Sequence, residues 1–422
     1  MLLELVFLLT AAPAAREDFS LDNGIRVTIV HAPAATREAI FTVLPLGLLG
    51  DDVRRAQHSH LLEHALIRST DPQGLSAPGF TLNGETQATT LRLETIAEAP
   101  YWREALTRHG RWLTARVFDP AMLEREKAAA ASELDTTVPH GFTHKWATAA
   151  WAQIVRHGLK HAAVRGDVAS ATVADMQTYV AAHVGPSPRV RIVCVGPIAP
   201  KDVRETLVAG IGMLPAAQGL APPPPPDAAP APSDRSATWD LPARHYIEWY
   251  ALPDGGPSDR AAAALLATAI TQNLMLAGET KILATAEAAP GVGRVLFVSA
   301  PLAADASPDA IRAATRKAID ALAKPAAGSP DLATRIRMAS AEVGGLPDFA
   351  AIRKARAGQP GLDLLEGNMI LGLVAVEEST GLSGNDLAAA YGGLKPERLA
   401  AIVSASLGEK SRSSLVLEPA AR

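Results

Sequence analysis

The stretch Ala56-Gln57-His58-Ser59-His60-Leu61-Leu62-Glu63-His64-Ala65-Leu66-Ile67 carries two histidines and a glutamate in the order His-x-x-Glu-His. Apolar residues at positions 61, 62, 65 and 66, with no Gly or Pro from 58 to 70, predict a helix over about 56–68. Positions four apart share a helix face, so His60 and His64 can aim their imidazoles at one point. Glu63 lies at the edge of the same face.

This arrangement is suited to zinc. Neutral imidazoles bind Zn²⁺, and a carboxylate beside the ion can take a proton from its bound water. The order is the inverzincin signature, the reverse of the commoner H-E-x-x-H helix. With eleven histidines in 422 residues, a chance occurrence is on the order of one in a hundred. The alternative is a solvated helix face, and a third ligand elsewhere in the chain would favour zinc.

A candidate for that third ligand lies in the segment 118–135. Asp119 and Pro120 predict a helix start, and the alanine run that follows favours a helix over 120–134. Glu126 and Glu133 are seven residues apart, two turns along one face. We predict that Glu133 is the third ligand and that Glu126 sits behind it, orienting a ligand or tuning the metal. The alternative is an ordinary alanine-rich helix with solvated glutamates.

Together the two segments resemble the insulinase, pitrilysin and mitochondrial processing peptidase family of zinc peptidases (M16). The resemblance covers most of the chain. Three further segments match the family. Phe19–Val27 resembles its opening strand with the Leu-x-Asn-Gly turn, and Asn83-Gly84-Glu85-Thr86 followed by Thr90 resembles its Asn-Ala-x-Thr strand. Arg191–Gly196 resembles its late buried strand. The resemblance implies an α+β fold of two homologous M16-like α/β sandwich domains. Each would have a mixed, largely antiparallel sheet packed with helices, and together they would form one half of a clamshell chamber.

The resemblance also assigns roles to single residues. The zinc ligands would be His60, His64 and Glu133, and Glu63 would be the catalytic base. Glu126 would support the metal from behind. The substrate backbone would be held by the strand that contains Asn83 and Thr86.

Several positions depart from the family's pattern near these segments. Gly84 replaces the usual Ala, and Arg92 stands where an aromatic residue is common. Gln57 and His58 replace a small residue or Gly before the metal helix. The segment between positions 64 and 83 is shorter than usual. These departures bear on how the site is assembled.

The sequence divides into an N-terminal metal-binding domain over 17–216, a Pro/Ala-rich linker over 217–237 and a metal-free domain over 238–422. The pattern of the second domain indicates a weak duplication of the first. His245–Pro253 parallels Ala39–Pro45, and the helix Ala261–Met275 stands where the metal helix stood but has no His or Glu. Other elements expected in the first domain are strands at 26–31, 39–44 and 89–95 and helices at 99–115, 145–156 and 173–183.

Composition narrows the class of protein. A length of 422 residues with 48% hydrophobic residues allows two or more domains and a large core. A net charge of −4, with no long basic run, argues against general nucleic-acid binding. Cys194 is the only cysteine, lies in a buried strand pattern, and is expected in the core.

The first residues resemble a secretory leader, which we place at 1–16. Residues 1–15 are apolar and end in Ala11-Ala12-Pro13-Ala14-Ala15, a run too short to span a bilayer stably. Against this, the stretch has no Lys or Arg and carries Glu4. We expect a periplasmic or secreted protein, with a cytoplasmic protein and a misassigned start as the alternative.

The second domain raises the question of a partner. In the family, an Arg and a Tyr on the metal-free half reach the substrate carbonyl, usually from a segment like Leu-Arg-x-x-x-Gly-Leu-x-Tyr. The matching region, 279–294, has no Tyr, and none occurs between Tyr250 and Tyr391. We therefore expect a related subunit to supply these groups in a heterodimer, with a homodimer as the alternative.

The expected activity is that of a zinc-dependent endopeptidase that hydrolyses peptides or unfolded polypeptide segments. Two alternatives remain open. One is a catalytically inactive, structural M16-like chamber subunit, which the missing Tyr would allow. The other is a metal-binding or peptide-binding module without hydrolysis.

Overall fold

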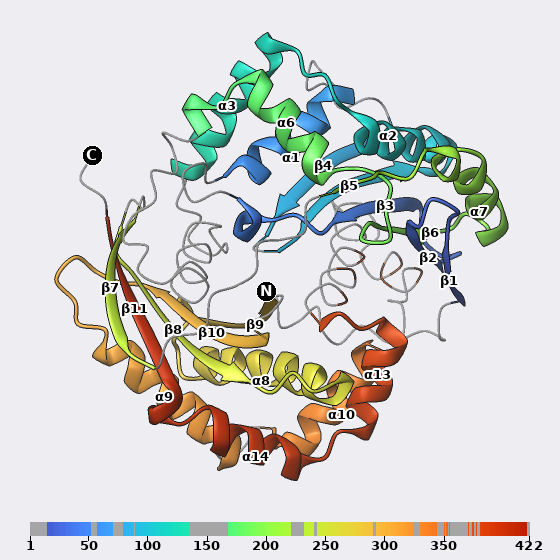
Figure 1. Ribbon diagram of the computed structural model, residues 1–422. Coiled ribbons are helices and arrows are strands. Elements are labelled where there is room, and N and C mark those ends of the chain that lie inside the picture. The colour runs from blue at the N-terminus through green and yellow to red at the C-terminus, as the bar shows by residue number, and fades with distance from the viewer. Residues whose placement is uncertain are drawn as a thin grey trace. The chain divides into compact units, whose positions relative to one another are not determined.

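The computed structural model describes residues 15–51, 57–70, 79–87, 89–135, 168–220, 232–239, 243–289, 293–324, 330–343 and 380–419, with a few single positions between 350 and 377. These residues form two compact units, each with its own sheet (Figure 1). The first unit takes the described residues up to 135, those of 168–220 and the positions between 350 and 374. The second unit takes the rest.

The first unit contains a six-stranded sheet in the order β1-β2-β6-β3-β5-β4. Its strands are β1 (Ala15–Ser20), β2 (Arg26–His31), β3 (Arg37–Leu44), β4 (Phe80–Thr86), β5 (Leu91–Glu98) and β6 (Arg191–Gly196). Strands β2 and β6 are parallel, and the other neighbouring pairs are antiparallel. Among the described strands, β4 therefore lies at the edge of the sheet and pairs on one side only.

Helices pack against this sheet (Figure 1). They are α1 (His58–Thr70), α2 (Trp102–Thr114), α3 (Pro120–Asp135), α6 (Val173–His183) and α7 (Pro200–Ala209), with 3-10 turns η1 (Leu48–Gly50), η2 (Ala99–Tyr101) and η3 (Ile211–Met213). Helix α1 contacts α2, α3, α6 and both strands β4 and β5. Its predicted apolar residues are fully buried: Leu61, Leu62, Ala65 and Leu66. The amphipathic pattern thus places α1 at the centre of the unit.

Local signals explain where the helices begin. Asp119 Oδ1 accepts a hydrogen bond of 2.7 Å from the backbone N–H of Met122, which caps the start of α3. Thr172 and Asp175 form a reciprocal capping box at the start of α6. Both helices match their predicted ranges closely, whereas the helix predicted at 145–156 lies outside the described residues. The strand predicted at 89–95 is found two residues later, as β5.

The second unit contains a five-stranded sheet in the order β7-β11-β8-β10-β9. Its strands are β7 (Asp234–Trp239), β8 (His245–Leu252), β9 (Leu283–Ala289), β10 (Gly293–Pro301) and β11 (Arg412–Pro419). Its helices are α8 (Pro257–Leu276), α9 (Asp309–Ala323), α10 (Leu332–Val343), α13 (Gly384–Gly393) and α14 (Pro396–Ser406), with the 3-10 turn η4 (Glu409–Ser411). Buried residues of β8, β10 and these helices form one hydrophobic core.

The two sheets share one topology. With β1 set aside, the spatial orders are β2-β6-β3-β5-β4 and β7-β11-β8-β10-β9. In both sheets the strand that comes last in the sequence lies between the first and the second, and it is parallel to the first. Helix α8 follows β8 and packs on β9 and β10, as α1 follows β3 and packs on β4 and β5. This correspondence confirms the predicted fold class of two related α+β domains with mixed, largely antiparallel sheets.

The ends of the predicted domains are only partly described. Residues 1–14 and 221–231, which hold most of the predicted leader and part of the linker, lie outside the described residues. Ala15 and Arg16 are already part of β1, and β7 begins at Asp234, inside the predicted linker range. Cys194 is buried in β6, as expected.

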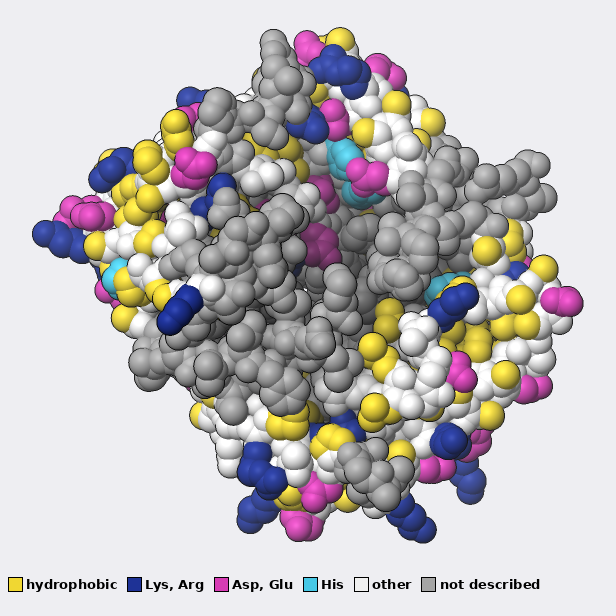
Figure 2. Space-filling model, turned by 180° about the vertical axis from the view of Figure 1, so that it is seen from behind, with side chains coloured by type: hydrophobic (Ala, Val, Ile, Leu, Met, Phe, Trp, Pro, Cys, Tyr) yellow, Lys and Arg dark blue, Asp and Glu magenta, His cyan; other side chains and the backbone are white. Residues whose placement is uncertain are grey.

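Two surface properties follow from the described residues. None of their helices is both long enough and apolar enough to cross a membrane. On the face drawn in Figure 2, acidic and basic side chains are intermixed, in keeping with 40 Lys and Arg against 44 Asp and Glu in the sequence.

Candidate metal centre

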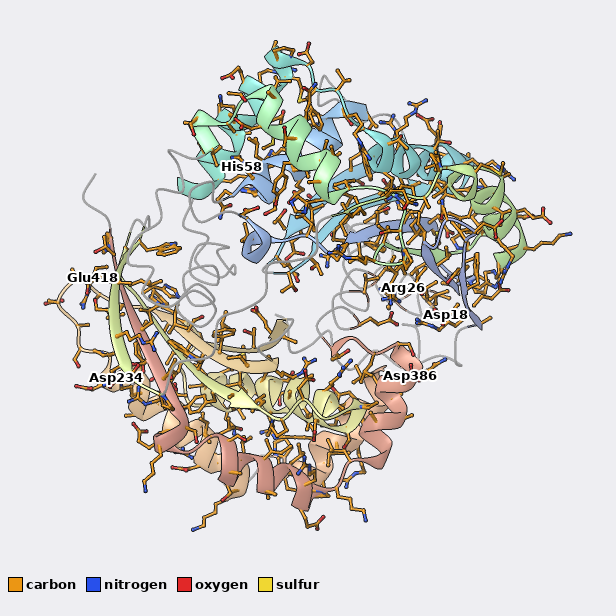
Figure 3. All side chains as sticks on the ribbon, viewed as in Figure 1. Asp18, Arg26, His58, Asp234, Asp386 and Glu418 are labelled. Atoms are coloured by element: carbon orange, nitrogen blue, oxygen red, sulfur yellow. The ribbon has the colours of Figure 1, made fainter. Side chains whose placement is uncertain are left out.

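The start of α1 is held by a buried carboxylate. The helix begins at His58, labelled in Figure 3. Asp51 accepts hydrogen bonds of 3.0 Å from both the backbone N–H and the hydroxyl of Ser59, and a third from the hydroxyl of Tyr179 on α6. The first N–H groups of a helix have no partner within the helix, so this carboxylate acts as a cap. Burial raises the pKa of Asp51 to about 7, although these hydrogen bonds oppose the rise.

Helices α1 and α3 bring together the three predicted metal ligands. The Nε2 atoms of His60 and His64 lie 3.3 Å apart. Glu133 Oε2 lies 3.2 Å from Nε2 of His60 and 3.5 Å from Nε2 of His64. One ligand atom from each residue lies within 4.8 Å of the other two. Among the described residues, this is the one group of three or more His, Cys, Asp or Glu side chains with such spacing.

The other nitrogen of each imidazole is also engaged. His60 Nδ1 lies 3.1 Å from Oε1 of Gln57, and His64 Nδ1 lies 3.1 Å from Oε2 of Glu126. Arg68 Nε, 3.3 Å from the other oxygen of Glu126, helps to hold that carboxylate. Amide and carboxylate oxygens only accept hydrogen bonds, so either ring, when neutral, carries its proton on Nδ1. Each Nε2 then presents a lone pair to the centre.

This donor set fits a zinc ion. Two imidazole lone pairs and a carboxylate oxygen face one another, and none of the three supplies a hydrogen to the others when both rings are neutral. Such a group of acceptors is stable around a cation. Two His and one Glu are the protein ligands of known catalytic zinc sites, which leave the fourth position for water or substrate.

A proton can take the place of the ion. Burial lowers the pKa of His64, but hydrogen bonds to Glu126 and Glu133 and the nearby charge of Glu63 outweigh it and raise that pKa to about 10. Hydrogen bonds from the two histidines hold the pKa of Glu133 well below its usual range. The centre therefore favours positive charge between these side chains, from a proton or from a metal ion.

Glu63, the predicted base, is buried between α1 and β4. Its Oε2 accepts a hydrogen bond of 2.7 Å from the hydroxyl of Thr86. Burial raises the pKa of Glu63, while His60, Thr86 and His64 oppose the rise. A Cβ built on Gly84 would lie 2.6 Å from Cγ and 2.7 Å from Oε1 of Glu63. Glycine in place of the expected alanine thus makes room for the glutamate.

The predicted substrate contacts divide between the two faces of β4. Asn83 and Thr86 are three residues apart, and successive strand residues point to opposite faces. Thr86 is fully buried toward α1, where it binds Glu63, whereas Asn83 is exposed and donates a hydrogen bond of 3.3 Å to Glu94. Asn83 is thus exposed on the other face of the strand, and Thr86 is placed to hold the glutamate.

Arg92, found in place of an aromatic residue, belongs to a buried ionic cluster on the Asn83 side of the sheet. Its side chain is 1% exposed. Its Nε lies 2.7 Å from Glu94, and its guanidinium also pairs with Glu85. Strand register places Glu85 opposite Arg92 and Asn83 opposite Glu94. The arginine therefore compensates two carboxylates beside the edge strand.

Comparison with known proteins identifies the fold. The sequence matches no protein-family model and no curated protein. Solved structures do match. A protease from Helicobacter pylori matches with a TM-score of 0.66 and 13% identity, over 97% of this chain and 100% of that one. A putative M16-like peptidase from Alicyclobacillus acidocaldarius matches with a TM-score of 0.64 and 14% identity, over 97% of this chain and 99% of that one. The first half of the periplasmic protease PqqL from Escherichia coli also matches, with a TM-score of 0.60 and 14% identity, over 97% of this chain and 93% of that one. The fold is that of an M16-like peptidase.

The matched structures cover 97% of this chain, including both of its sheets. The chain covers 48% of full-length PqqL, so it corresponds to one half of that protein. In the second unit, α8 occupies the place of α1 in the topology and has no His or Glu in the range 261–275. Among the described residues, the candidate metal centre therefore lies in the first unit.

The structure adds three residues that the motif did not reveal. Gln57 was noticed only as a departure from a small residue, yet it contacts His60. Asp51 caps the metal helix, and Thr86 contacts the predicted base. None of the three belongs to the His-x-x-Glu-His pattern, because each acts through a contact between segments distant in sequence or through an unusual backbone.

Proposed function

We propose that this protein is a zinc-dependent endopeptidase that hydrolyses peptides or unfolded polypeptide segments. The observation that carries the proposal is the meeting of His60, His64 and Glu133, with both Nδ1 atoms engaged by acceptors. The proteases among the structural neighbours support a peptidase fold. The residues present would hold Zn²⁺ through Nε2 of His60, Nε2 of His64 and the carboxylate of Glu133.

The chemistry divides between the ion and the chain. When bound, Zn²⁺ would lower the pKa of a water ligand and polarise a peptide carbonyl. Glu63 would accept the proton of the attacking water and return it to the leaving amine. Thr86 would hold the carboxylate of Glu63 in place through its hydroxyl. Burial, which raises the pKa of Glu63, would bring that group nearer to the pH at which it must both accept and donate a proton.

The substrate would bind as an added strand along β4. This strand lies at the edge of the sheet and carries Gly84 beside Glu63. An extended peptide can pair with the free backbone groups of an edge strand, and folded proteins rarely offer such a segment. The exposed Asn83 would contact the peptide backbone. The proposed substrates are therefore peptides and unfolded segments.

A second, related chain would complete the site. The family resemblance calls for an Arg and a Tyr from the metal-free half, but the range 251–390 contains no Tyr. Arg294, at the end of the matching region, is buried and lies 3.6 Å from Asp254 in its own unit. We propose a heterodimer whose other subunit supplies the Arg and Tyr, with a homodimer as the alternative. If the chain alone, as a monomer, cleaved peptides as fast as its complex with the partner, the need for a partner would be contradicted.

The missing Tyr also favours a second candidate function, a catalytically inactive M16-like subunit. Such a subunit would bind zinc and a partner but would not cleave peptides even in their complex.

We propose that the protein is exported to the periplasm or the medium, because residues 1–15 form an apolar run like that of a secretory leader. The alternative location is the cytoplasm. Cell fractionation tests that proposal.

The decisive test of function replaces the proposed base. Glu63→Gln should retain zinc, because the three ligands remain, and should abolish hydrolysis of a quenched-fluorescent peptide. The matched control is Glu124→Gln, an exposed glutamate of α3 whose side chain is 69% exposed, and it should keep full activity. Undiminished hydrolysis by the Glu63→Gln protein would refute the assigned base. Zinc binding without turnover in the wild type, even beside its partner, would favour the inactive subunit.

A further inference from the structure

Gln57 has an unusual backbone. Its φ is +71°, and it is the one non-glycine residue with a positive φ among the described residues. In this left-handed region the Cβ of most residues crowds the backbone, and only Gly, Asn and Asp adopt it readily. A glutamine held there is strained, and strain of this kind persists only where the surroundings fix the conformation.

The surroundings of Gln57 do fix it. The side chain of Asp51 accepts hydrogen bonds from the backbone N–H groups of Gln57 and Ser59. On the other side, the carbonyl oxygen of Gln57 accepts a hydrogen bond of 2.9 Å from the N–H of Leu61, in the first turn of α1. Gln57 itself is 1% exposed. Its backbone is thus held from both directions at the entrance to the metal helix.

Among the described residues, the side chain of Gln57 makes one hydrogen bond, and it is to a proposed metal ligand. Oε1 lies 3.1 Å from Nδ1 of His60. The amide nitrogen of Gln57 is buried and has no partner among the described residues. A buried amide with an unpaired donor is unfavourable for folding. Neither the backbone strain nor the unpaired donor stabilises the fold. What the left-handed conformation of Gln57 provides is the contact between its side chain and His60.

We propose that Gln57 is a positioning residue for the metal centre. Its side-chain oxygen, Oε1, fixes the proton of His60 on Nδ1 and fixes the direction of the ring. Nε2 of His60 is thereby kept available to Zn²⁺. The left-handed backbone brings the carboxamide to the ring from the residue three places before His60. A glycine there would allow the same turn but would leave Nδ1 without this acceptor. This inference rests on the proposed zinc site, but not on peptide hydrolysis.

Three substitutions separate the role of the acceptor from that of the backbone. Gln57→Gly relieves the strain and removes the acceptor. Gln57→Asn also suits a left-handed backbone, but its side chain is one carbon too short to take the place of Oε1. Gln57→Glu keeps an acceptor oxygen at the same length. A purely structural role predicts that Gly and Asn are harmless, whereas a positioning role predicts that both weaken metal binding.

The experiment measures zinc affinity of the full chain by competition with a chromophoric chelator, together with the melting temperature of the metal-free protein. We expect Gln57→Gly and Gln57→Asn to bind Zn²⁺ about 10–100-fold more weakly than the wild type. Gln57→Glu should bind at least as tightly as the wild type. The metal-free Gly variant should melt no lower than the wild type, because relief of the backbone strain offsets the loss of the hydrogen bond to His60 and of side-chain packing.

Other results for the metal affinities would contradict the inference. Wild-type affinity in the Gly and Asn variants would mean that the acceptor has no role. A Glu variant as weak as the Gly variant would mean that the acceptor oxygen is not the reason for the loss. Weak binding together with a lower melting temperature in the Gly variant would assign Gln57 to folding instead. If the wild type binds zinc and follows the expected series but cleaves no peptide, the proposed activity fails while this inference stands. A wild type that binds no zinc overturns both.

Discussion

The side chain of Glu63 lies so close to Gly84 that a methyl group on the glycine would come within 2.6 Å of Glu63 Cγ. This contact fixes the base of the proposed reaction between α1 and the edge strand β4. It also gives a reason for a glycine where an alanine was expected from the family.

Gly84→Ala should therefore displace Glu63 while leaving the metal ligands in place. We expect peptide hydrolysis to fall at least tenfold and zinc affinity to stay at the wild-type value. Crowding in a packed site typically destabilises by about 1–3 kcal/mol, which chemical unfolding would measure. The control is Gly50→Ala, whose added Cβ would meet nothing closer than 3.8 Å. Full activity in the Gly84→Ala protein would show that the close contact is not needed.

Thr86→Val should shift the pH dependence of hydrolysis. The hydroxyl of Thr86 lowers the pKa of Glu63, so its removal should raise that pKa further. Glu63 must be ionised to accept a proton, and the acidic limb of the kcat/KM profile should therefore move to higher pH. The exposed Thr114→Val on α2 is the control and should leave the profile unchanged. A shift to lower pH would contradict the assigned contact.

Zinc binding should release a proton. In the metal-free protein the pKa of His64 is raised to about 10, so its imidazole is protonated at neutral pH. The ion needs the lone pair of Nε2, so affinity should rise by about tenfold per pH unit while one proton is displaced. Calorimetry in buffers of different ionisation enthalpy should show about one proton released per ion. Binding that is independent of pH from 6 to 8 would contradict the proposed exchange of proton for metal.

Arg92→Met should destabilise the first unit. The substitution leaves Glu94, whose side chain is 4% exposed, buried without its cationic partner. Removing one member of a buried pair typically costs about 3–5 kcal/mol of unfolding free energy. The exposed Arg111→Met on α2 serves as the control. Adding Glu94→Leu to Arg92→Met should recover much of the loss, and a double variant no more stable than the single one would contradict this account.

Sequence patterns predicted the elements that depend on local spacing. The apolar positions of α1 and the Asp-Pro start and alanine run of α3 are local, and both helices were found within two residues of their predicted ranges. The meeting of Glu133 with His60 was expected through the resemblance. The counterpart of β3 in the second unit, β8, was also recognised from its sequence.

The features that the sequence could not reveal depend on register and backbone. The pairing of β4 with β5 and the packing of α1 on β4 place Thr86 against Glu63, whereas Asn83 faces the other way. Strand alternation alone would have separated residues 83 and 86, although not assigned Thr86 its partner. The positive φ of Gln57 is a property of the folded chain, because glutamine has no local preference for it.

The central claim is that His60, His64 and Glu133 bind one zinc ion, and anomalous diffraction at the zinc absorption edge tests it most directly. We predict a single anomalous peak in crystals of the zinc-loaded protein, bonded to Nε2 of both histidines at about 2.0–2.1 Å and to a carboxylate oxygen of Glu133. A peak elsewhere, or a Glu133 side chain turned away from the two rings, would contradict it.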